Sequence, residues 1–180
     1  NSGSTSLKFA LYQATNTELN IVASGGFTGM PNNASLKIKA ANKQTITNLN
    51  FNPEDNLNHE AALIKLLTIL REKFPNLSIE YAGHRVVLGG EKYTQATKLD
   101  LASLEYLENL SKIEPTHQAY EVMGARILAK IFPEIKQSAT FDTSFHRTMP
   151  KVAEFYPVPE EITAHGVRHW GFHGISYAYI

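Results

Sequence analysis

The sequence contains no cysteine, no long apolar run and no internal repeat. The absence of cysteine excludes disulfide bonds and thiolate metal sites. No apolar run approaches the roughly 18 residues that a membrane-spanning helix requires, and the given residues include no signal peptide. Low-complexity segments are absent as well. We therefore expect a cytoplasmic protein with no membrane partner.

The sequence also lacks an excess of either charge. Seventeen Lys and Arg residues balance seventeen Asp and Glu residues, and no stretch clusters the basic ones. Surfaces that bind nucleic acid need such clusters to neutralise phosphates, so no nucleic-acid partner is expected. With 43% hydrophobic and 19% charged residues, the 180 residues have the composition of a globular domain with one substantial core.

Hydrophobic periodicity predicts that the first fifty residues are mainly β-structure. Alternation with period two predicts strands in four ranges, the first two of which form a hairpin: Phe9–Gln13, Ile21–Ala23, Ser35–Ala41 and Thr45–Phe51. The Gly, Pro and Asn content of residues 25–33 predicts a loop. A buried strand is expected at 78–82 and another strand at 137–141.

Three helices are expected between and around these later strands. The first has one apolar face and ends at Pro75: Leu63, Leu67, Leu70 and Phe74. Asp100 can cap a second helix that runs through Leu110. Thr116 can cap a third, with Pro133 after its end and with a buried face of Tyr120, Met123, Ile127 and Ile131. This order of elements predicts an α/β layered domain, in which ligand sites lie where strands end.

The chain opens with a turn that could hold phosphate. Residues 1–8 read N-S-G-S-T-S-L-K and lead directly into a predicted strand. Glycine lets the backbone approach an anion, successive backbone N–H groups can form an anion-binding nest, and the hydroxyls and Lys8 add donors. A plain hairpin loop has the same composition, so both interpretations stay open.

Four further polar clusters adjoin apolar runs: G-H-R-V-V-L-G-G-E at 83–91, P-T-H-Q at 115–118, F-D-T-S-F-H at 141–146 and G-F-H-G at 171–174. The guanidinium of Arg85 suits planar carboxylates and phosphoryl oxygens, although it could instead form a structural salt bridge. Asp142 ends an apolar strand, where both catalytic carboxylates and helix caps occur.

The histidines near the end of the chain could suggest a zinc site. The spacing of His165, His169 and His173 would place three imidazoles on one helix face. Glycines would break such a helix, and no carboxylate or thiolate completes a ligand set. We therefore interpret these histidines separately, and any of them could also be structural.

Together with N-S-G-S-T-S-L-K, these clusters resemble one family in their order and spacing. The chain is similar from Asn1 to Ile180 to the amino-terminal half of an acetate kinase, or of a close carboxylate kinase such as a propionate or butyrate kinase. The resemblance implies an actin-like, ribonuclease-H-like α/β fold, shared with sugar kinases and chaperone ATPases, in which helices flank a mixed sheet. It also implies reversible phosphoryl transfer from ATP to acetate, which gives acetyl phosphate and ADP, with Mg²⁺ or Mn²⁺, in a homodimer.

The resemblance implies a role for each matching residue. Arg85 and His173 would contact the migrating phosphoryl group, Asp142 would orient substrate or magnesium-bound water, and His117 would line the same cleft. His146 would hold its loop by hydrogen bonds rather than touch substrate. On this basis, removing Arg85 should reduce turnover far more than stability.

The resemblance also implies which residues contact the phosphates and which contact the acyl group. Four residues would meet phosphate or nucleotide oxygens, and the first of them would also be a candidate ligand for magnesium: Asn1, Ser4, Ser6 and Lys8. Three residues would form the small apolar pocket for the acyl group: Val87, Thr116 and Phe172.

The chain departs from the family pattern beside these positions, at Leu88, Thr116, Gln118, Ala119, Ile175 and Tyr177. The departures leave open an altered carboxylate substrate. They also leave open a second hypothesis, a binding module that holds an acyl phosphate or another small anion without turnover. Both ends of the sequence look cut, so we expect residues 1–180 to be the N-terminal domain of a longer protein whose absent C-terminal domain supplies most of the nucleotide site. The isolated fragment should then be inactive.

Overall fold

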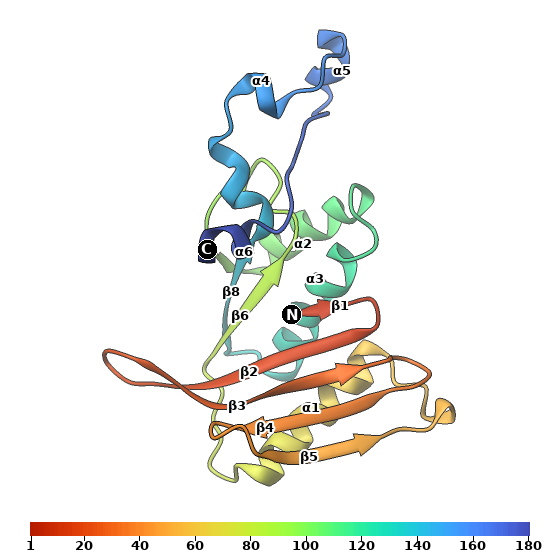
Figure 1. The fold of residues 1–180 in the computed structure, drawn as a ribbon, viewed down its shortest axis with the longest axis vertical. Coiled ribbons are helices and arrows are strands. Elements are labelled where there is room, and N and C mark those ends of the chain that lie inside the picture. The colour runs from red at the N-terminus through yellow and green to blue at the C-terminus, as the bar shows by residue number, and fades with distance from the viewer.

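The computed structural model describes residues 1–180 and contains two separate β-sheets with helices packed against them (Figure 1). The larger sheet is antiparallel, and its strands are adjacent in chain order: β1 (Ser2–Gly3), β2 (Ser6–Ala14), β3 (Leu19–Thr28), β4 (Ser35–Ala40) and β5 (Thr45–Asn50). The predicted hairpin and the two strands that follow it are confirmed.

Strand β3 extends into the segment 25–33, which the sequence predicted to be a loop. Gly25 and Gly26 pair with the strands on both sides. A Cβ atom at Gly25 would overlap the carbonyl oxygen of Lys37, and one at Gly26 would overlap that of Leu7. The loop prediction was therefore wrong for residues 25–28, because glycine here permits a close approach of backbones inside a sheet.

Helix α1 (His59–Lys73) packs on one face of the larger sheet, and the interface contains the larger of two hydrophobic cores. The Asn58 side chain caps the helix by accepting a hydrogen bond from the Ala61 N–H at 2.9 Å. Three leucines are buried as their spacing predicted: Leu63, Leu67 and Leu70. They belong to the same core as Phe27, Leu36 and Ile38 of the sheet.

The smaller sheet is mixed. Strand β6 (Tyr81–Val86) runs parallel to β8 (Lys136–Phe141), and β7 (Thr97–Leu99) pairs antiparallel with the other edge of β8. The strand predicted at 137–141 is confirmed. The buried strand predicted at 78–82 was wrong in position and burial, because pairing starts at Tyr81, whose side chain is 64% exposed. Ile79 instead packs against the core of the other sheet.

Helices α2 (Leu101–Asn109) and α3 (Gln118–Ile131) cover the smaller sheet and enclose the second core. Asp100 caps α2 as predicted, since its Oδ1 accepts from the Ser103 N–H at 2.7 Å. The N-cap of α3 is His117 rather than the predicted Thr116, and Met123, predicted to be buried, is 39% exposed. The buried face of α3 is Gln118, Glu121, Val122, Ala125 and Ile127.

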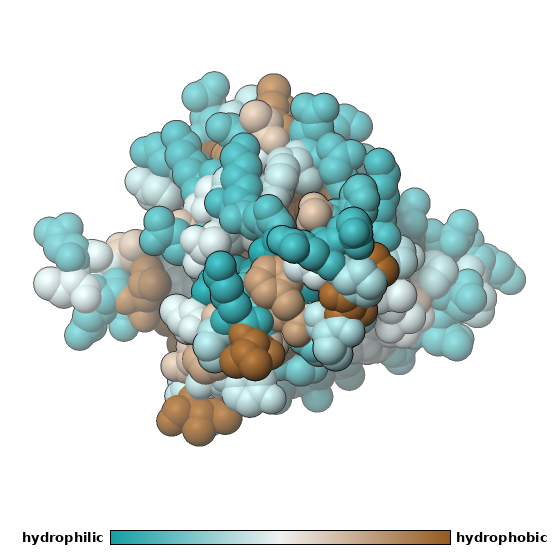
Figure 2. Space-filling model, turned by 90° about the horizontal axis from the view of Figure 1, so that it is seen from above, coloured by the Kyte–Doolittle hydropathy of each residue, from teal (hydrophilic) through white to brown (hydrophobic).

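Residues 142–180 leave β8 and return to it (Figure 1). They form η3 (Asp142–Thr148), α4 (Lys151–Glu154), α5 (Glu160–Ala164) and α6 (Gly174–Tyr179); the short helices η1 (Pro53–Asp55) and η2 (Leu110–Lys112) lie earlier. Helices α4 and α5 project beyond the sheets, whereas α6 packs against η3. Seen from the end with α4 and α5, the surface is mostly hydrophilic with scattered hydrophobic residues (Figure 2). None of the helices has the length and apolarity needed to cross a membrane.

Candidate functional site

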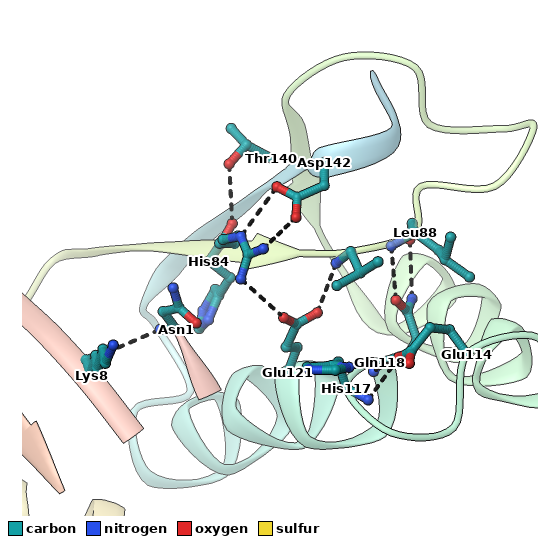
Figure 3. A network of polar contacts seen from close by, with 12 residues as sticks. Asn1, Lys8, His84, Leu88, Glu114, His117, Gln118, Glu121, Thr140 and Asp142 are labelled. Atoms are coloured by element: carbon teal, nitrogen blue, oxygen red, sulfur yellow. Dashed lines mark hydrogen bonds and ion pairs between the residues drawn. The ribbon is translucent and has the colours of Figure 1, made fainter. Parts of the chain in front are cut away.

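Arg85 and Asp142 meet at the carboxyl ends of the two parallel strands. Strands β6 and β8 pair with Arg85 opposite Thr140 and Val86 opposite Phe141, so the residues that follow both strands lie at one edge. The Arg85 Nε donates to Asp142 Oδ1 at 3.1 Å and its Nη2 donates to Oδ2 (Figure 3). Two residues from separate motifs thus form one bidentate, charge-assisted pair.

A second carboxylate, Glu121 of α3, lies on the other side of Arg85. Its Oε1 lies 3.8 Å from Arg85 Nη1, and its Oε2 accepts from the Val87 N–H at 2.7 Å. The side chains of Glu121 and Asp142 are only 1% and 2% exposed. Glu121 was not predicted from the sequence, although its spacing of four residues from His117 places both on one face of α3.

Burial and charge shift the protonation of this cluster. Burial raises the pKa of Glu121 to about 7, although the hydrogen bond from Val87 and the charge of Arg85 oppose the shift. Burial also disfavours the charged form of Arg85, but its contacts with Asp142 and Glu121 outweigh that effect and raise its pKa. The Arg85 side chain is 32% exposed. A permanently charged fork that reaches solvent can bind an incoming anion.

Thr116 and His117 lie just before α3, where Glu114 organises the helix terminus. Glu114 Oε2 accepts from the backbone N–H groups of His117 at 2.7 Å and Gln118 at 2.9 Å. Its Oε1 accepts from the Thr116 hydroxyl and from His117 Nδ1. Burial alone would raise the pKa of Glu114, but these hydrogen bonds lower it to about 2. The exposed His117 ring lies close enough for its charge to act on Glu121.

The opening segment forms a tight hairpin, which satisfies its backbone. Gly3 pairs with Ser6, so Ser4 lies in the turn, and the Asn1 carbonyl accepts from the Lys8 N–H at 2.8 Å. Figure 3 shows Asn1 beside the strand that carries the arginine. The hairpin therefore brings its first residue toward the charged cluster.

Lys8 lies directly opposite Asn1 in this hairpin, because the Asn1 amino group also donates to the Lys8 carbonyl oxygen at 3.1 Å, so the two side chains point to the same face. The Lys8 side chain lines a surface depression of about 340 Å³ on the larger sheet, together with Lys37 and Lys39 and with the glycines of β3. Asn1 and Lys8 thus lie on one face of the hairpin, whereas Ser4 lies in its turn. Their contact with phosphate stays a prediction.

The G-F-H-G segment is held against η3. His146 Nε2 donates to the Phe172 carbonyl oxygen at 2.9 Å, so the predicted loop-holding contact of His146 is present. A Cβ atom at Gly174 would overlap the carbonyl oxygen of Asp142, and glycine therefore permits this close approach. His173, with a left-handed φ of 57°, lies just before that contact and is exposed. The structure thus brings His173 to the same strand end as Asp142.

The three residues predicted to line an acyl pocket come from different elements. Val87 is buried after β6, Thr116 is exposed before α3, and the Phe172 ring is half-exposed before α6. The Thr116 hydroxyl is engaged by Glu114. Their role as pocket walls stays a prediction.

The chain does not form a metal-binding cluster from its own side chains. No group of three or more His, Asp or Glu residues is arranged to hold an ion. Magnesium is commonly bound by one or two carboxylates together with substrate phosphates and water. Both carboxylate oxygens of Asp142 accept from Arg85, and each keeps a further lone pair that could accept from magnesium-bound water, the role predicted for Asp142. The magnesium contact predicted for Asn1 stays a prediction.

The three histidines of the zinc alternative lie in different surroundings. His165 ends α5, whereas the ring of His169 lies 3.7 Å from that of Tyr156, centroid to centroid. His173 precedes α6. They do not share one helix face.

Comparison with known proteins identifies similar sequences over the whole chain. The model of the Acetokinase family matches residues 1–180. "Acetate kinase 2" of Photobacterium profundum is 38% identical over 183 residues, which cover 100% of this chain and 45% of that protein. "Acetate kinase" of Rhodopseudomonas palustris is 34% identical over 182 residues, with the same coverage of 100% and 45%.

Solved structures of similar proteins agree with the fold. A propionate kinase from Francisella tularensis subsp. tularensis matches with a TM-score of 0.84 and 32% identity, over 99% of this chain and 45% of that one. Porphyromonas gingivalis acetate kinase matches with a TM-score of 0.81 and 28% identity, over 98% of this chain and 45% of that one. The chain thus spans less than half the length of these relatives.

Proposed function

We propose, from the premise that this chain belongs to the acetokinase family, that the full-length protein is an acetate kinase. It would transfer the γ-phosphoryl group of ATP to acetate, giving acetyl phosphate and ADP, and would catalyse the reverse reaction. The observation that supports this most directly is the Arg85 fork, which two buried carboxylates hold at a strand end while it remains open to solvent. The fold of the chain is the actin-like ATPase fold of its structural neighbours, with a mixed sheet and flanking helices.

We assign residues 1–180 to the N-terminal domain, as the family resemblance implies; they cover about 45% of the relatives. The remainder of the full-length protein would supply most of the nucleotide site. A divalent ion, Mg²⁺ or Mn²⁺, would neutralise charge on the phosphates of ATP. We expect the ion's ligands to be the nucleotide, Asn1 and groups outside these residues, with Asp142 reaching the ion through bound water. A homodimer and a cytoplasmic location complete the proposal and follow from the family resemblance.

Phosphoryl transfer of this kind needs positioning and charge more than covalent chemistry. Acetate is an anion at neutral pH, since carboxylic acids have pKa values of about 4 to 5, so it needs no general base. As the phosphoryl group migrates, charge spreads over its equatorial oxygens, which fixed donors stabilise. We assign this role to Arg85 and His173, with His117 along the transfer path. Asp142 would orient Arg85 and, through it, the substrate.

The remaining residues would hold the ends of the two substrates. Asn1, Ser4, Ser6 and Lys8 would contact phosphate oxygens, and Val87, Thr116 and Phe172 would surround the acyl group. Propionate is the second candidate substrate, because one structural neighbour with 32% identity is described as a propionate kinase. Butyrate would require a larger pocket of the same kind.

The test is acyl hydroxamate formation by the full-length protein with ATP, magnesium and acetate, propionate or butyrate. Arg85→Lys keeps the charge but loses the fork, and should lower kcat/KM by about 100-fold or more. Arg126→Lys is the matched control, because Arg126 forms a similar fork with Glu108 on α2, away from the strand ends. No product with any acid from a folded protein would contradict the proposal and favour a binding module for small anions.

A further inference from the structure

Glu121 is the buried ionisable group at this site that the proposed chemistry does not use. One of its oxygens is satisfied, because Oε2 accepts from the Val87 N–H at 2.7 Å. The other, Oε1, is buried and makes no hydrogen bond, and it lies 3.8 Å from Arg85 Nη1. A buried oxygen without a hydrogen bond is costly and requires an explanation.

The Arg85 guanidinium contacts Asp142 along one edge and faces Glu121 along another. Asp142 takes the Nε and Nη2 edge, which leaves Nη1 facing Glu121. An acetate or phosphoryl anion that binds Arg85 with good geometry must use the edge that Asp142 leaves open. Oε1 of Glu121 thus lies where a negatively charged oxygen of the substrate is expected.

The charge of the cluster depends on the state of Glu121. With both carboxylates ionised, one guanidinium faces two negative charges, and an approaching anion is repelled. With Glu121 neutral, the charges of Arg85 and Asp142 balance, and a neutral carboxyl can donate a hydrogen bond through its free oxygen. Burial raises the pKa of Glu121 to about 7, so both states are populated at neutral pH.

We propose that Glu121 is a positioning residue that holds the Nη1 edge of Arg85 in place of a bound anion, and that the substrate anion is admitted when Glu121 is neutral. The anion is identified as acetate or acetyl phosphate only through the proposed function, on which this inference rests. The other charged or titratable groups that act on Glu121 are Arg85 of β6, Asp142 at the end of β8, His117 before α3 and, in this chain, the amino group of Asn1.

The first test measures the KM for acetate of the full-length protein between about pH 6 and pH 9. If only neutral Glu121 admits the anion, KM increases above about pH 7, and the increase approaches tenfold for each pH unit. The change in kcat should be smaller. Glu121→Gln should flatten this rise. Glu108→Gln, which breaks the Glu108–Arg126 pair, should keep it. A rise of equal size in wild type and Glu121→Gln would overturn the inference.

A second measurement needs no variant and therefore does not depend on whether Glu121→Gln folds. Calorimetric titration of the full-length wild-type protein with acetate, at about pH 8 in buffers of different ionisation enthalpy, counts the protons taken up. We expect the uptake of most of one proton per acetate, because a group with a pKa of about 7 is mostly ionised at that pH. Binding without proton uptake would overturn the inference.

The outcomes separate this inference from the proposed function. Proton-linked acetate binding without turnover would contradict the kinase and support the role of Glu121. Turnover with a KM that is independent of pH would support the kinase and overturn the role of Glu121. Neither binding nor turnover would contradict both.

Discussion

Replacing Arg85 by alanine should destabilise this domain, and the loss should grow as the pH rises. The structure gives the reason, because Asp142 and Glu121 are 2% and 1% exposed and both face this guanidinium. Without it, two buried carboxylates lie unpaired and close together. The sequence alone predicted that turnover would fall far more than stability, and the burial of both partners makes the cost in stability substantial as well.

The magnitude follows from the burial of the pair. Breaking a buried ion pair from one side costs about 3 to 5 kcal/mol, and the 32% exposure of Arg85 reduces this to about 2 to 3 kcal/mol. Burial raises the pKa of a carboxyl left without its partner. Such a carboxyl has a higher pKa in the folded protein than in the unfolded one, where it is near 4, so the folded protein holds its proton more tightly. The stabilisation from this proton is complete below about pH 4 and is lost as the pH rises through the folded pKa. The difference between wild type and Arg85→Ala should therefore be larger at about pH 8 than at about pH 5.

Urea unfolding of the 180-residue chain at these two pH values measures the effect. Arg126→Ala is the control, because its pair with Glu108 is partly exposed and should contribute about 1 kcal/mol or less. Adding Asp142→Asn to Arg85→Ala should recover part of the lost free energy of unfolding without restoring turnover to the full-length protein. Equal unfolding midpoints for Arg85→Ala and Arg126→Ala at both pH values would refute the reasoning.

Three further changes test other contacts of the site. Glu114→Gln should lower the free energy of unfolding by up to about 3 kcal/mol near pH 7, because the pKa of Glu114 is lowered from 4.5 to about 2 in the folded protein. In an acid unfolding series, the difference in stability between wild type and Glu114→Gln should vanish as the pH falls from 4.5 to about 2. Gly171→Ala combines a φ of 70° with overlap of its Cβ and the His146 ring. It should cost more stability in thermal unfolding than Gly166→Ala, which has a φ of 86° but whose Cβ would meet only Glu91 Oε1, at 4.0 Å; equal losses would contradict this. Gln118→Leu removes three hydrogen bonds from a fully buried amide and should cost about 2 to 4 kcal/mol in urea unfolding; a neutral result would mean that the freed backbone groups find other partners.

The elements that the sequence predicted correctly are those encoded by local patterns. The leucines of α1 recur at helical spacing, and Asp100 precedes an apolar run, so each identifies its helix without knowledge of the rest of the fold. The errors arise where one residue type serves two purposes. Gly25 and Gly26 have the composition of a loop, but they lie in a strand because neighbouring backbones approach closely.

The sequence singled out two members of the charged cluster but not their arrangement. Arg85 and Asp142 each stood out in a motif, yet their pairing depends on the parallel register of two strands, and they lie 57 residues apart. Glu121 was missed because the rotation of α3 about its axis is not set by an apolar stripe alone. Its polar residues Gln118 and Glu121 bond the backbone that follows β6, and this turns Met123 outward. The partner of a buried polar residue depends on the tertiary structure, which a single sequence does not reveal.

Helix α3 takes part in both hydrophobic cores. Val122 and Ala125 lie in the core under the smaller sheet, while Ile127, less than one turn further on, lies in the core under the larger sheet. A shift or rotation of α3 on ligand binding at Arg85 would therefore also disturb the packing beneath the larger sheet. Rearrangement at the strand ends and loosening of the larger sheet are thus cooperative, and the rigidity of that sheet limits how far the site can adapt.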